Sequence, residues 1–137
     1  MKKYTELELK DILEKHFLWL EEDPNGVEAD LSGADLRELD LSWYNFYGID
    51  LRGANFYGTN LSNANLSSTD LNGADLSEAN LKGADLRGAS LIGADLSKAS
   101  LNEADLRGVD FRGTNLRGAN LCGVYPREAE ILIETVV

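Results

Sequence analysis

The sequence predicts an all-β solenoid with an α-helical cap at its N-terminal end. Leu or Phe occupies every fifth position from Leu31 to Leu121, nineteen times without interruption. Gly follows two residues later in twelve of these nineteen repeats. Residues 1–26 lack this period and instead carry apolar residues at the spacing of an amphipathic helix. The chain therefore divides into a helical cap, a repeat array and a short tail.

The first predicted element is the cap, residues 1–26, which ends in a turn at residues 23–26. Thr5 and Glu8 have the spacing of a capping box, with Thr5 as the N-cap. We expect the apolar helix face to cover the first coil, because the terminal repeats of a solenoid need protection. An external partner for this face is the alternative. The residues predicted to pack from this face are Leu9, Ile12, Leu13, His16, Phe17 and Leu20.

The second element is the array over residues 27–125, with the unit Ala-Asp-Leu-polar-Gly. Side chains of an extended chain alternate sides, so Ala and Leu face one way and Asp and the polar residue face the other. The fifth residue then acts as a corner, where Gly takes a positive φ without steric cost. Repeated bends of this kind wind the chain into coils with an apolar interior. The predicted core includes Leu71, Leu76, Leu81, Leu86, Leu91 and Leu96.

The number of sides per coil follows less directly from the residues. A 20-residue turn aligns the glycines from Gly33 to Gly113 in one column, which favours four sides over three. The units ADLSG, ADLRG and ANLKG resemble those of the pentapeptide-repeat family, whose signature is A(D/N)LXX. This resemblance covers Ala29 to Val124. It implies a right-handed, four-sided (quadrilateral) parallel β-helix of about five coils, and it implies little about activity.

The third element is the tail, residues 126–137, in which Pro126 breaks the pattern and residues 130–137 are apolar and β-prone. It either folds over the last coil or pairs with a second molecule, since both arrangements protect an exposed edge. The family resemblance implies dimerisation through the C-terminal end in many members, usually through a helical extension that is short or missing here. The expected state is a monomer or a weak homodimer through this end.

Catalytic and metal-binding chemistry find no support in the sequence. His16 is the single histidine and lies on the apolar helix face, so we expect it to pack as a core residue rather than act as a base or metal ligand. Cys122 is the single cysteine and is expected to be a bystander thiol at an outward position. Stacked carboxylates such as Asp30 and Asp50 could attract cations, but we expect them to bond nearby backbone. The sequence thus predicts no enzyme, no cofactor and no metal.

Membrane insertion and export are not expected either. No apolar run of 18 residues is present, and charged residues follow Lys2 and Lys3 where a signal sequence would be apolar. Together with the single cysteine, these features predict a cytoplasmic protein.

The net charge of −11 raises the question of DNA mimicry. Some pentapeptide-repeat proteins imitate duplex DNA and bind DNA gyrase or topoisomerase IV. Residues 29–125, however, carry thirteen acidic and eight basic groups, a net charge of −5. Duplex DNA presents one negative charge per about 1.7 Å, whereas five coils would extend about 23 Å. A DNA-mimicking inhibitor is therefore the alternative function, and we expect no nucleic acid as a partner.

Aromatic residues near the cap are the best candidates for a contact surface. Trp43 falls at a predicted corner, and Tyr47 and Tyr57 fall at outward positions. Trp43 and Tyr47 should lie on adjoining faces, either contacting a partner or packing against the cap helix or its turn. The sequence predicts a non-enzymatic, rigid protein-interaction scaffold whose partner is another protein. A purely structural module without a ligand is a further alternative.

Overall fold

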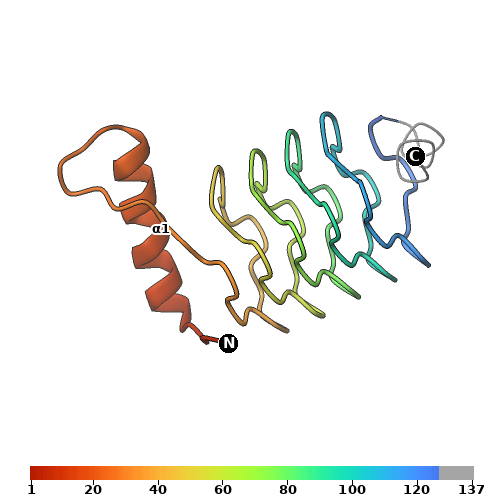
Figure 1. Ribbon diagram of the computed structural model, residues 1–137, viewed down its shortest axis with the longest axis horizontal. Coiled ribbons are helices and arrows are strands. Elements are labelled where there is room, and N and C mark those ends of the chain that lie inside the picture. The colour runs from red at the N-terminus through yellow and green to blue at the C-terminus, as the bar shows by residue number, and fades with distance from the viewer. Residues whose placement is uncertain (127–137) are drawn as a thin grey trace.

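A stack of coils with one helix at its N-terminal end makes up the fold (Figure 1). The computed structural model describes residues 1–126, so the predicted capping or dimerising tail lies outside the described residues except for Pro126. Within residues 1–126, the helix is α1 (Glu6–Leu20), and the repeats pair through isolated β-bridges rather than longer strands.

Helix α1 begins at the capping box that the sequence predicts. The Glu8 N–H donates to Thr5 Oγ1 at 3.1 Å, and the Thr5 N–H donates to Glu8 Oε2 at 2.7 Å. After the helix, the chain folds back so closely that a Cβ on Gly26 would lie 2.1 Å from the backbone nitrogen of Trp19. Only glycine fits there, and this close return leads the chain from the helix into the first coil.

The coils are held in register by parallel bridges between residues twenty positions apart, such as Asp30 to Asp50 and Asp50 to Asp70. In each repeat up to Leu106 the Leu or Phe N–H donates to the next coil, as Leu31 does to the Asp50 C=O at 2.9 Å. The Asp or Asn N–H donates to the previous coil, as Asn55 does to the Ala34 C=O at 2.9 Å. One turn therefore takes twenty residues, or four repeats, as the glycine column favoured.

The fifth residue of every repeat has a positive φ, which confirms its predicted role as a corner. The twelve glycines at this position adopt it freely. Seven other residues adopt it too, with φ between 56° and 66°. The bend thus belongs to the repeat position and not to glycine alone. These seven residues are Glu38, Trp43, Asn63, Ser68, Glu78, Lys98 and Glu103.

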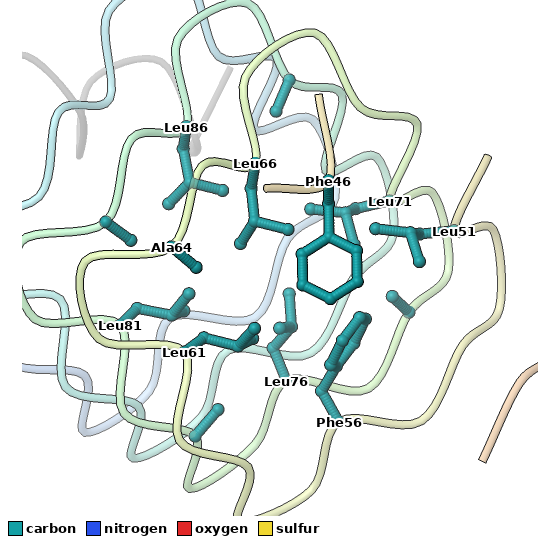
Figure 2. Packing of buried hydrophobic residues seen from close by; sticks show 14 of the residues in the cluster. Phe46, Leu51, Phe56, Leu61, Ala64, Leu66, Leu71, Leu76, Leu81 and Leu86 are labelled. Atoms are coloured by element: carbon teal, nitrogen blue, oxygen red, sulfur yellow. The ribbon is translucent and has the colours of Figure 1, made fainter. Parts of the chain in front are cut away.

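Leu and Ala side chains fill the interior of the coils (Figure 2). The core is bulkier near α1, where the rings of Phe46 and Phe56 meet edge to face with centroids 6.5 Å apart. Thr59 replaces Ala in one repeat, and its buried hydroxyl donates to the Leu36 C=O at 2.6 Å, so no polar atom is left unpaired there. The predicted core residues are all fully buried: Leu71, Leu76, Leu81, Leu86, Leu91 and Leu96.

The apolar face of α1 contacts this core. Leu9, Leu13 and His16 are buried, and Ile12 and Phe17 are partly buried against the core cluster. Leu20 differs from the prediction, because its side chain is 39 % exposed. It is the last residue of the helix, just before the chain turns away.

The N-terminal segment before α1 pairs with the first coil, residues 29–48, which no sequence pattern predicted. Lys3 forms a parallel bridge with Asp35, and the Asp35 N–H donates to the Lys2 C=O at 2.8 Å. The segment thus occupies, on one face, the place that an earlier coil would take.

Candidate functional site

His16 joins α1 to the first coil with both ring nitrogens. Nδ1 accepts the Ala29 N–H at 3.1 Å, which assigns the ring proton to Nε2, the donor to the Tyr47 C=O at 3.0 Å. The side chain is 0 % exposed, and Trp19 stacks on it with ring centroids 5.5 Å apart. With both nitrogens engaged, the imidazole has no free position from which to act on a substrate.

The Asp and Asn columns are engaged with local backbone. In nearly every repeat the carboxylate or amide Oδ1 accepts the N–H two residues later, as Asp30 does from Ser32 at 2.9 Å and Asn65 from Ser67 at 3.0 Å. This bond stabilises the bend after each Leu. Residues 1–126 contain no group of three or more Asp, Glu, His or Cys residues placed to hold a metal ion.

Arginine side chains neutralise many of these carboxylates. The Arg52 guanidinium hydrogen-bonds Asp50 through Nε at 2.9 Å and holds the pKa of that carboxyl below its ordinary value. Arg87 lowers the pKa of Asp85 in the same way. The same pairing recurs in three other repeats: Asp35 with Arg37, Asp105 with Arg107 and Asp110 with Arg112.

The three predicted contact aromatics are exposed but do not form one cluster. Trp43 is 76 % exposed, Tyr47 42 % and Tyr57 38 %. The Tyr57 hydroxyl donates to Glu78 at 3.1 Å, and its ring lines a separate hollow of about 440 Å³ that Lys3 also lines. Trp43 lies at the corner that ends one face of the first coil, and Tyr47 lies on the next face. The high exposure of Trp43 argues against the predicted alternative, in which it packs on the helix.

Trp43 also has an unusual backbone. Its φ is +66°, a region that costs a bulky L-residue about 1–2 kcal/mol. In later coils the same corner is occupied by smaller or polar residues, including Gly83 and Gly123. Trp43 is the only aromatic residue with a positive φ among residues 1–126. The first coil thus holds a large apolar side chain in solvent on a strained backbone.

Two hollows lie between α1 and the first coil. The coil residues that line one of them precede Trp43 in the sequence, and those that line the other follow it. One, of about 130 Å³, is lined by Leu9 of α1 and by the repeat residues 39–41. The other, of about 210 Å³, is lined by Leu13 and Phe17 of α1 and by residues 44–45. Tyr44 also lines the second hollow, and its hydroxyl is buried and has no hydrogen-bond partner within the described chain. Its burial raises the pKa of Tyr44.

The remaining sites suggest no chemistry. Cys122 is exposed and unpaired in the described part of the chain. Over residues 1–126, no helix has the length and apolar character needed to cross a membrane.

Comparison with known proteins gives a consistent result. A family profile described as pentapeptide repeats matches residues 27–53, 54–91 and 89–125, with eight copies. A pentapeptide repeat protein from the Arabidopsis thaliana thylakoid lumen is 39 % identical, with a TM-score of 0.73 over 76 % of this chain and 72 % of that one. A pentapeptide repeat protein from Nostoc is 26 % identical, with a TM-score of 0.53 over 88 % of this chain and 97 % of that one.

A plasmid-mediated fluoroquinolone resistance protein is also 26 % identical, over 76 % of this chain and 63 % of that one, but its TM-score is 0.38. So low a score supports no functional argument. No curated protein matches the chain. The matched repeats and the two closer structures show that this chain belongs to the pentapeptide-repeat family and has that family's right-handed quadrilateral β-helix.

Proposed function

We propose that this protein is a non-enzymatic, rigid interaction scaffold that contacts another protein around Trp43. The exposure of Trp43 on a strained backbone carries the proposal. A fold gains nothing from such a residue by itself, because glycine would fit the corner better and would expose no apolar ring. Strained positions often persist where they serve a contact, and Trp is among the residues that contribute most to binding.

The architecture supports this role. We interpret residues 27–125 as about five coils and residues 1–26 as their N-terminal cap, with Leu9 and Leu13 buried against the core. Within residues 1–126 the filled interior of the coils leaves no cavity for a substrate, whereas the regular hydrogen bonding between coils gives a stiff platform. A stiff surface loses little entropy when it binds.

DNA mimicry has less support from the charges. Five of the Asp side chains on the coils pair with the Arg two residues later, so much of the negative charge is neutralised locally. An imitation of duplex DNA would need a dense, unpaired negative charge along a face. The DNA-mimicking inhibitor and the purely structural module are therefore the weaker candidates.

A capture experiment with matched variants tests the proposal. The tagged full chain, Trp43→Gly and Tyr57→Phe would each be incubated with an extract of the source cells, and the bound proteins quantified by mass spectrometry. Gly suits the Trp43 backbone, so that variant should keep the circular dichroism of the parent. A protein held by the parent and by Tyr57→Phe, but lost with Trp43→Gly, is the expected result. If every captured protein binds Trp43→Gly equally well, Trp43 is not the contact.

A further inference from the structure

The first coil has backbone groups that point away from the stack. From Asn55 onward each Asp or Asn N–H donates to the previous coil, as Asn65 does to the Tyr44 C=O at 2.9 Å. The first coil has no previous coil, and the N-terminal region replaces only some of these bonds. Lys2 accepts the Asp35 N–H at 2.8 Å, and His16 donates to the Tyr47 C=O at 3.0 Å.

Two neighbouring faces of this edge are left open. Within residues 1–126, the N–H groups of Asp40 and Asn45 have no hydrogen-bond partner. These two residues flank the corner at Trp43. The amides of Asp30 and Asp50 also lack a partner, but neither is next to Trp43: Asp30 lies where the chain enters the coil, and Asp50 lies in the second coil and forms a parallel bridge with Asp30. The open edge is therefore the stretch 40–45.

The two hollows described above lie beside this edge. The hollow of about 130 Å³ includes Asp40 in its lining, and the hollow of about 210 Å³ includes Asn45. Leu9, Leu13 and Phe17 of α1 form the apolar wall opposite. An unpaired edge next to apolar hollows is the arrangement that accepts an additional strand, with backbone bonds giving affinity and hollows receiving alternate side chains.

We propose that residues 40–45 accept a segment of a partner protein that pairs with Asp40 on one face and with Asn45 on the next, and that bends past Trp43 at the corner. This inference rests on the proposed function and names the form of the partner. The molecule already uses the same pairing once, because Lys3 adds to the neighbouring face at Asp35. The added segment would continue that pairing on the next two faces.

The charges around the hollows define the chemistry of the segment. Glu6, Glu14 and Asp40 line them together with one cation, Lys10, which pairs with Glu6 at 3.1 Å. The net negative rim fits a segment that alternates apolar residues with Lys or Arg. The chain's own residues 127–137 carry three Glu and one Arg, so a second copy fits this rim poorly.

Titration of the labelled full chain with short peptides tests this directly. The amide signals of Asp40 and Asn45 would be followed by nuclear magnetic resonance while a peptide that alternates Val and Lys is added. We expect saturable shifts of these two amides that weaken as salt is raised. The same peptide with N-methyl groups along its pairing edge should bind about tenfold more weakly, because it cannot donate to the C=O groups of Asp40 and Asn45, which accept no hydrogen bond within residues 1–126.

Three controls make the outcome decisive. A peptide that alternates Val and Glu should leave the Asp40 and Asn45 signals unchanged, and Trp43→Gly should weaken binding of the Val/Lys peptide. A peptide of residues 127–137 that shifts the same amides more strongly would overturn the proposal in favour of a second copy. Equal binding of the N-methylated peptide, or no shift with any peptide, would overturn strand addition. Partner capture that depends on Trp43 would then still stand as a separate result.

Discussion

Replacing His16 with Phe tests whether one imidazole fastens α1 to the coils. The variant keeps an aromatic ring beside Trp19 but removes both hydrogen bonds of the imidazole. The Ala29 N–H and the Tyr47 C=O would lose their partners, and an unsatisfied buried group costs about 1–3 kcal/mol. We therefore expect the free energy that holds α1 against the coil to fall by about 2–6 kcal/mol, the sum for two such groups.

Urea denaturation followed by two signals measures this effect. Trp19 fluorescence reports the docking of α1, because the indole stacks on residue 16, and a Trp43→Phe background removes the other tryptophan. Circular dichroism reports the coils. In His16→Phe the fluorescence change should move to lower urea than the change in circular dichroism. His16→Gln should recover part of the loss, since its amide can donate and accept. Coincident transitions at the parent's urea concentration in His16→Phe would refute this account of the imidazole.

Other substitutions test the core, the cap and the charges. Leu71→Ala should lower the free energy of unfolding by about 2–5 kcal/mol, while Lys82→Ala on the surface should change it by less than about 0.5 kcal/mol; equal urea midpoints would contradict the packing. Phe17→Asp places a charge in an apolar contact and should cause association through the exposed edge; a parent-like profile in size exclusion with light scattering would show that α1 is no cap. Arg52 lowers the pKa of Asp50, so that pair stabilises the fold above the ordinary Asp pKa of about 3.9, and the effect is lost as pH falls below it. Arg52→Gln should therefore shift acid unfolding to higher pH, and an unchanged acid midpoint would argue against the pair. The purified protein should leave gyrase supercoiling unchanged, and salt-sensitive inhibition at micromolar concentration would instead support DNA mimicry.

The repeats could be predicted because each one repeats the same local rule. Alternation along an extended chain places Leu71 inside, and a fifth residue with positive φ returns the next repeat to the same orientation. Every coil gives the same assignment of inward and outward positions, so an error in that assignment would have to recur in every repeat. The capping box at Thr5 was predictable for the same reason, since it depends on residues three positions apart.

Contacts at the end of the stack could not be predicted in this way. The bridge from Lys3 to Asp35 and the two bonds of His16 depend on where α1 lies in space, and no local pattern records that position. The helical period placed Leu20 on the apolar face, but the period does not say where the coil beneath it stops. The corner position of Trp43 was predictable, whereas its exposure was not, because the repeat pattern does not record where α1 lies relative to that corner.

We expect specificity for a partner to lie at the N-terminal end of the stack. Along the faces, Asp and Asn side chains hydrogen-bond the backbone of their own turns, and the backbone N–H and C=O groups hydrogen-bond the neighbouring coils. These faces are therefore regular and chemically similar from coil to coil. At the first coil the regularity ends, since the amides of Asp40 and Asn45 are unpaired within residues 1–126 and Trp43 stands between them. A partner that recognises this protein among other solenoids of the same fold would gain most by reading that end, where the sequence departs from its own repeat.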